Sequence, residues 1–166
     1  MLIAVGAEVV LKSSSRERRV PVEELATGYL TTVIEPGEIL TEIRVPPLAA
    51  ETRATYIKFL PRTQDDYATV SVGATLRMNG DRCEDVRVAL GGVAPTALRV
   101  RQVEDALRGQ PLTDVAVADA TGLVPDLVDP PDDARGSADY KRRMARVWTE
   151  RALRQLRDQS NGVMHR

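Results

Sequence analysis

The chain has 166 residues, 43% hydrophobic and 28% charged, so it can bury a core and has the composition of a globular protein. Its formal net charge of −1 argues against a surface for nucleic acid or for an anionic membrane. One cysteine and one histidine exclude an internal disulfide and a zinc site, and no apolar run approaches the ~20 residues of a membrane span. The lone cysteine fits a reducing compartment, so we expect a cytoplasmic protein.

Three strands are expected in the first part of the chain. Residues 2–11, LIAVGAEVVL, are apolar and β-branched enough for a buried strand, and no basic segment precedes them as in a signal peptide. Residues 18–22 can form a second strand beside the first. This second strand should end at Pro21 or lie at a sheet edge there, because proline has no N–H to donate to the ladder. The elements expected next are a helical turn from Glu23, a turn at Pro36-Gly37 and a strand containing Ile39, Ile43 and Val45.

Pro46-Pro47 marks a predicted domain boundary. Two prolines fix an extended direction, and the residues that follow them show no strand pattern. Three strands by themselves make a marginal unit. The expected division is a piece of one domain at 1–46, a linker at 47–52, a complete small domain at 53–160 and a tail at 161–166.

The centre of the second part is a predicted hairpin. Apolar residues alternate with small or polar ones from Val70 to Met78, which gives that strand one apolar face. Asn79-Gly80 suits the central positions of a type I′ turn, where φ is positive. The alternation resumes from Val86 to Leu90, which predicts the returning strand.

Three helices are expected to cover this hairpin. They are a helix over 97–108 capped by Thr96 and closed at Gly109, a candidate from Leu112 to Val124, and a long helix capped by Ser137 with an apolar stripe from Tyr140 to Leu156. A small antiparallel sheet with about three covering helices is an α+β fold.

The polar insert before the hairpin holds the residues of chemical interest. Tyr56, Lys58 and Leu60 alternate and therefore share one face of a strand, where a cation is either a solvated edge or a ligand contact. Asp65 and Asp66 are adjacent in an extended segment, so they point to opposite sides and make a poor acid–base pair. Cys83 has no histidine within reach in the sequence, which argues against a catalytic cysteine.

Four motifs follow one another in an order that resembles a known family. They are Tyr56-x-Lys58 with Arg62, Asp66, Ala68 and Val70; the hairpin; Leu90-Gly91-Gly92-Val93-Ala94-Pro95-Thr96; and Asp133-x-Arg135-Gly136-Ser137-x-x-Tyr140. The pattern is similar to the flavoprotein (medium) subunit of molybdenum hydroxylases, the carbon monoxide dehydrogenase and xanthine dehydrogenase type enzymes. The resemblance covers nearly the whole chain and implies that residues 1–46 end an FAD-binding domain, while 53–160 form the flavoprotein C-terminal domain.

The resemblance also implies a flavin site made by particular residues. Lys58 would approach the flavin ring beside Tyr56, with Asp66 at the same site. Ile39 and Leu40 follow Gly37-Glu38 in a segment like one that packs near the isoalloxazine ring in the family. The alternatives are a solvated lysine, an Arg62–Asp66 pair that braces the loop, and ordinary strand core for Ile39 and Leu40. The family's Gly-rich loops for the FAD diphosphate have no counterpart here, so the FAD site is incomplete.

The partners that the resemblance implies are a large subunit with the molybdenum cofactor, a small subunit with [2Fe-2S] clusters and a separate FAD-binding N-terminal half. Electrons would pass from the clusters through FAD to an acceptor, and this chain alone would be inactive. The competing interpretation is a cofactor-free interaction or assembly module from a split or truncated gene.

Overall fold

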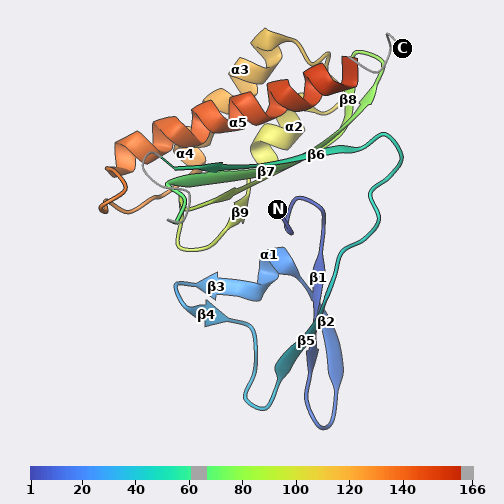
Figure 1. The fold of residues 1–166 in the computed structure, drawn as a ribbon, viewed down its shortest axis with the longest axis vertical. Helices are drawn as coiled ribbons and strands as arrows, with labels where there is room; N and C mark the ends of the chain where they lie inside the picture. Colours follow the sequence, from blue (N-terminus) through green and yellow to red (C-terminus); the bar gives the residue numbers. More distant parts are fainter. Residues whose placement is uncertain (61–66, 162–166) are drawn as a thin grey trace.

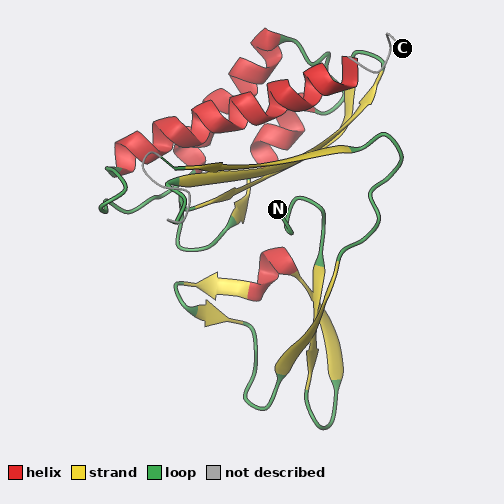
Figure 2. Ribbon diagram, viewed as in Figure 1, coloured by secondary structure: helices red, strands yellow, loops and turns green. Residues whose placement is uncertain are grey.

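The computed structural model describes residues 1–60 and 67–161, which form an α+β fold in two parts (Figures 1 and 2). The strands are β1 (Glu8–Lys12), β2 (Glu17–Pro21), β3 (Ala26–Gly28), β4 (Thr31–Thr32), β5 (Ile39–Arg44), β6 (Arg53–Phe59), β7 (Val70–Asn79), β8 (Arg82–Gly91) and β9 (Leu98–Arg99). The helices are α1 (Val22–Leu25), α2 (Arg101–Leu107), α3 (Asp114–Gly122), α4 (Val124–Leu127) and α5 (Ala138–Asn161). Within the described part, no helix has the length and apolar character that a membrane crossing requires.

The N-terminal part is built on a three-stranded antiparallel sheet in the order β2-β1-β5. Val9 pairs with Val20 on one side and with Ile43 on the other, so these three side chains share a face. A small core forms there, covered by α1 and by the segment that follows the β3–β4 hairpin. Its members are Val9, Leu11 and Val20, with Val22, Leu25, Val33 and Ile34 packed against them.

The first predicted strand is only half correct. The strand begins at Glu8, and the preceding residues form turns in which the Gly6 amide donates to the Ile3 carbonyl at 3.0 Å. Gly6 has a φ of +70°, which a residue without Cβ adopts at little cost, and the chain reverses there into β1. Ile3 and Ala4 are nevertheless buried, because they pack against Ala89 of the second sheet. Apolar composition alone does not distinguish such a turn from a strand.

The C-terminal part is a four-stranded antiparallel sheet in the order β6-β7-β8-β9, with the helices on one face (Figure 2). The long helix α5 crosses β6 and β7, while α2 packs on β8. The apolar rows that the sequence predicted, such as Val72 and Leu76 on β7 and Val88 on β8, are fully buried beneath these helices with Leu153 and Leu156 of α5. The α+β architecture is confirmed.

The turn of the central hairpin lies one residue later than expected. Asn79 pairs with Arg82, which leaves Gly80 and Asp81 as the two loop residues. Gly80 has a φ of +61°, whereas Asn79 and Asp81 do not have positive φ. A glycine at the first central position with positive φ there alone is the type II′ pattern, so the type I′ prediction is wrong.

The start of the second helix is also corrected. Thr96 caps no helix, because Leu98 pairs with Leu90 and extends the sheet as β9. The helix α2 begins only at Arg101, and its buried Glu104 accepts hydrogen bonds from the Val88 amide (2.9 Å) and from the Arg99 guanidinium (2.8 Å). These bonds satisfy the edge of β8 and hold the segment in the sheet.

The caps of the two longer helices follow ordinary side-chain rules. Thr113 caps α3, since its hydroxyl accepts from the Ala116 amide at 3.1 Å. Ser137 caps α5 as expected, accepting from the Tyr140 amide at 3.2 Å. Both hydroxyls satisfy amides that the first helical turn leaves without a partner.

The two parts meet on the sheet face that the helices leave uncovered (Figure 1). The Thr75 hydroxyl donates to the Ala4 carbonyl at 3.4 Å, and a Cβ on Gly73 would lie 2.9 Å from the Cα of Met1. Glu23 of α1 forms an ion pair with Arg101 of α2 at 2.7 Å. The first residues therefore cover the middle of this face and leave the end of β6 open.

Candidate functional site

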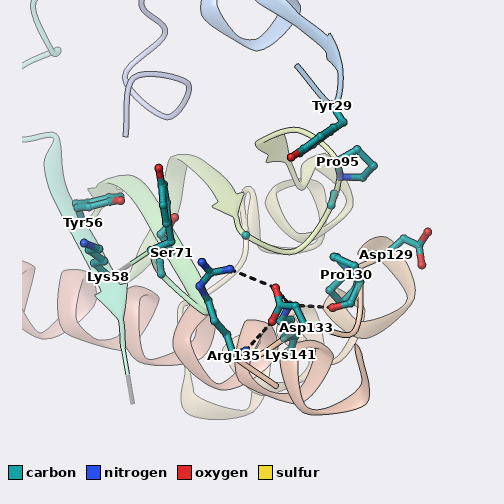
Figure 3. A pocket seen from close by; sticks show the side chains of 15 residues that line it. Tyr29, Tyr56, Lys58, Ser71, Pro95, Asp129, Pro130, Asp133, Arg135 and Lys141 are labelled. Atoms are coloured by element: carbon teal, nitrogen blue, oxygen red, sulfur yellow. Dashed lines mark hydrogen bonds and ion pairs between the residues drawn. The ribbon is translucent and has the colours of Figure 1, made fainter. Parts of the chain in front are cut away.

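A cleft of about 1010 Å³ lies on the open part of this sheet face (Figure 3). Its walls come from β6 and β7, from the loops that follow β8 and precede α5, and from the tip of the β3–β4 hairpin. The lining residues are Tyr29, Tyr56, Lys58, Tyr67, Ala68, Ser71, Gly92, Ala94, Pro95, Asp129, Pro130, Pro131, Asp133, Arg135 and Lys141.

Tyr56 and Lys58 stand side by side on the floor of the cleft. Tyr56 pairs with Gly73 and Lys58 pairs with Ser71, so both side chains extend from the face opposite the helices. Both are exposed, Tyr56 by 52%. The expectation that the two share a face is confirmed, and that face is the open one. A cation and an aromatic ring are thus presented together to whatever the cleft holds.

Two further tyrosines border the cleft, and the sequence did not single them out. Tyr29 is 79% exposed at the tip of the β3–β4 hairpin, where Leu30 has a φ of +54°. Tyr67 is 80% exposed, and the Arg135 guanidinium carbon lies 5.3 Å from its ring centre. Large exposed aromatic faces beside cationic groups suit a planar ligand with polar edges.

An ion pair between a buried lysine and a more exposed aspartate holds one wall of the cleft. Lys141 has a side chain only 2% exposed, and its ammonium donates to Asp133 Oδ2 at 2.7 Å and to the Pro131 carbonyl at 2.8 Å. The Lys141 hydrogen bond lowers the pKa of Asp133, which also accepts from the Arg135 amide at 2.8 Å. The loop before α5 is therefore tied to the helix that follows it (Figure 3). Lys141 went unnoticed in the sequence because it precedes Arg142 and Arg143, a run typical of a solvated face.

Two of the other residues expected at the site lie away from the cleft. Ile39 and Leu40 are on β5, outside the lining of the cleft, and are 66% and 39% exposed. Asp66 and Arg62 lie outside the described residues. Of the four expected contacts that the structure describes, the cleft brings together Tyr56 and Lys58.

Glu38 fixes the segment that carries Ile39 and Leu40. Its side chain is 2% exposed and accepts two hydrogen bonds from Arg18, each at 2.8 Å, and one from Arg16 at 3.0 Å. A fourth bond comes from the Glu35 amide at 2.9 Å, across the turn at Gly37. The Arg18 hydrogen bond is the main reason that the pKa of Glu38 falls from its ordinary value of 4.5 to about 2.

Gly92, directly after the end of β8, has a packing role. Gly92 has a φ of +80°, and a Cβ there would lie 3.0 Å from the Thr69 carbonyl oxygen. Both conditions require glycine where β8 bends into the cleft wall. Cys83 is equally structural, since it is fully buried and burial raises the pKa of its thiol to about 11.

Comparison with protein families matches both parts of the chain. Residues 55–156 match the model described as CO dehydrogenase flavoprotein C-terminal domain, and residues 1–48 match the FAD binding domain in molybdopterin dehydrogenase. The CO dehydrogenase flavoprotein C-terminal domain model matches more than half of the residues of this chain, so the chain belongs to that family.

Curated relatives and solved structures agree with this assignment. The chain is 38% identical over 91% of its length to the carbon monoxide dehydrogenase medium chain of Hydrogenophaga pseudoflava, and 34% identical over 94% to the glyceraldehyde dehydrogenase medium chain of Sulfolobus acidocaldarius. It covers 52% and 55% of these proteins, so it spans about half the length of the curated relatives it matches. The solved carbon monoxide dehydrogenase from Hydrogenophaga pseudoflava superimposes with a TM-score of 0.88 at 40% identity, over 92% of this chain and 53% of that one.

Proposed function

We propose that this chain is a component of the FAD-carrying medium subunit of a molybdenum hydroxylase-type oxidoreductase. In that enzyme a large subunit with the molybdenum cofactor oxidises the substrate. A small subunit with [2Fe-2S] clusters passes the electrons on, and the flavin delivers them to an acceptor. The share of this chain is one wall of the flavin site together with a surface for its partner subunits. Family membership of both parts of the chain supports the proposal.

The observation that carries the proposal is the presentation of Tyr56 and Lys58 on the open sheet face of the cleft. An isoalloxazine ring needs a flat contact surface and a cationic donor near its polar edge. The exposed tyrosines and Lys58 fit those needs, so the residues present fit the ring of FAD. When bound, FAD would accept electrons and pass them on, while Tyr56 and Lys58 would hold and orient the ring.

The diphosphate of FAD would be held by residues outside this chain. A diphosphate is normally held by a Gly-rich loop or a helix N-terminus that presents several backbone amides. The sequence has no such Gly-rich loop, so the rest of FAD would be held by the remaining part of the FAD-binding domain. We assign residues 1–46 to that domain, 47–52 to a linker and 53–160 to the C-terminal domain. Ile39, Leu40 and Asp66 remain proposed flavin contacts, and the cytoplasm remains the proposed location.

The experiment is a fluorescence measurement on the assembled, FAD-loaded enzyme. A tyrosine stacked on a flavin quenches the flavin's emission, so Tyr56→Leu should increase it while FAD remains bound. Tyr140→Leu is the control, because Tyr140 lies against Gly136 at the start of α5 and outside the cleft lining. Unchanged emission in Tyr56→Leu with full FAD occupancy would remove Tyr56 from the flavin site.

A cofactor-free assembly module is the second candidate, favoured by the half-length match to the relatives. It predicts that a complex purified with all partner subunits holds no FAD near this chain. A complex with one FAD per copy of this chain contradicts that candidate. A stable complex without flavin contradicts the proposed function instead.

A further inference from the structure

The two edges of the three-stranded sheet differ in a way that indicates different surroundings. The β2 edge carries Arg18 and Arg19 and ends at Pro21, features that block pairing with another strand. The β5 edge is six residues long without proline, and among the described residues its only strand partner is β1. An open edge of this kind normally receives a strand or a covering element.

The apolar face of this sheet continues onto β5 without cover. Val9 is 1% exposed beneath α1 and the segment after β4, whereas its pairing partner Ile43 is 53% exposed on the same face. On the opposite face, Val10 is fully buried beside Glu42, which accepts from Arg44 at 2.8 Å. The core formed by Val9, Leu11 and Val20 therefore stops short of β5.

The length of the relatives indicates what covers this surface. The FAD-binding domain model matches only residues 1–48, which contain this sheet, and the chain covers about half of each relative. We propose that the outer edge of β5, with Ile43 at its centre, receives a β-strand from the remaining part of the FAD-binding domain, an inference that rests on the proposed function. The added strand pairs with the free backbone groups of β5, and its apolar side chains cover Ile43.

Binding measurements test the surface. The chain is mixed with the part of the Hydrogenophaga pseudoflava medium chain that lies outside its alignment to this chain. Titration calorimetry should show binding that Ile43→Glu weakens at least tenfold, because a carboxylate replaces the apolar side chain at the new core. Val115→Glu is the matched control. Val115 is 69% exposed on α3, a helix that covers the other sheet, so this variant should bind like the wild type. Absence of binding, or equal weakening by both variants, overturns the proposal.

Hydrogen exchange distinguishes strand pairing from nonspecific contact. Amides of β5 should become protected when the added polypeptide binds, while those on the outer side of β2 should exchange as before. Protection gained equally on both edges, or on neither, overturns the pairing.

Two further measurements distinguish this proposal from self-association of the chain and from a failure of the proposed function. Light scattering should show the chain alone as a monomer, and a dimer that Ile43→Glu dissociates would assign β5 to a second copy instead. FAD content is measured on the same mixture. A mixture that binds through β5 without retaining FAD contradicts the proposed function and leaves the docking surface standing.

Discussion

Lys141 and Asp133 form an unequal pair, in which a lysine ammonium with a 2% exposed side chain lies 2.7 Å from the carboxylate of a side chain that is 31% exposed. Asp133 keeps its bond from the Arg135 amide when the lysine is removed. When the carboxylate charge is removed, Lys141 keeps its hydrogen bond to a neutral acceptor, the carbonyl oxygen of Pro131. The cost of breaking the pair should therefore depend on which partner is changed.

Asp133→Asn should destabilise the chain more than Lys141→Met. The asparagine leaves a buried ammonium without its counter-ion, which costs about 3 kcal/mol or more of unfolding free energy. The methionine fills a similar volume and removes both hydrogen bonds of the ammonium, but it also removes the buried charge, so the net loss should be smaller, about 1.5 kcal/mol. Urea denaturation of the two variants measures the difference.

Arg142→Met is the control at the next position of α5. Its ion pairs with Asp129 and Asp139 involve largely exposed carboxylates, and such pairs contribute about 0.5 kcal/mol or less. Equal losses in Asp133→Asn and Lys141→Met would show that burial does not set the cost at this pair.

Glu38 should make the stability of the N-terminal part depend on pH. Its carboxyl has a pKa of about 2 in the folded chain and an ordinary value of 4.5, so the unfolded state binds the proton more readily. The stabilisation by Glu38 is complete above about pH 4.5 and is lost as the pH falls towards 2. The stability advantage of the wild type over Glu38→Gln should thus shrink across that interval, as measured by urea denaturation at each pH.

Glu24→Gln provides the comparison for this titration. Glu24 lies exposed on α1, in the same part of the chain. Its difference in stability from the wild type should be small, because an exposed side chain of this kind contributes little to the fold. An advantage over Glu38→Gln that persists unchanged at pH 2 would contradict the role assigned to the Arg16 and Arg18 bonds.

Lys58→Met tests the cationic contact in the assembled, FAD-loaded enzyme. A cation near the ring favours the more negative, reduced form of the cofactor, so its loss should lower the midpoint potential. Losing one charge-assisted hydrogen bond corresponds to roughly 30 mV or more for a two-electron couple. A redox titration followed by flavin absorbance gives the value. Arg77→Met is the control, because Arg77 pairs with Glu84 at 2.7 Å near the turn end of β7. An unchanged midpoint potential in Lys58→Met would show that Lys58 is a solvated lysine at the sheet edge and not a flavin contact.

Alternation along β7 and β8 predicted the central sheet because the apolar side chains of those strands face a single core. Ser137 predicted the start of the longest helix because capping is local chemistry. The turn at Gly80 and the strand at Leu98 were mispredicted for a different reason. Cross-strand register decided them, through Asn79 with Arg82 and Leu98 with Leu90, and register depends on residues distant in sequence.

The candidate site shows the same division between local and distant information. The shared face of Tyr56 and Lys58 follows from strand alternation, so the sequence predicted it. Tyr29 reaches the cleft only because two separate parts of the fold meet there. Lys141 and Glu38 are buried charges, and their partners approach through tertiary structure that no spacing reveals.

The most direct test of the account is equilibrium dialysis of FAD against the purified chain, alone and together with the remaining part of the FAD-binding domain. The chain alone should bind FAD weakly or undetectably, because it supplies the ring wall and no diphosphate loop. The combination should hold one tightly bound FAD per chain. Submicromolar affinity of the chain alone, or no FAD bound by the combination, would contradict the account.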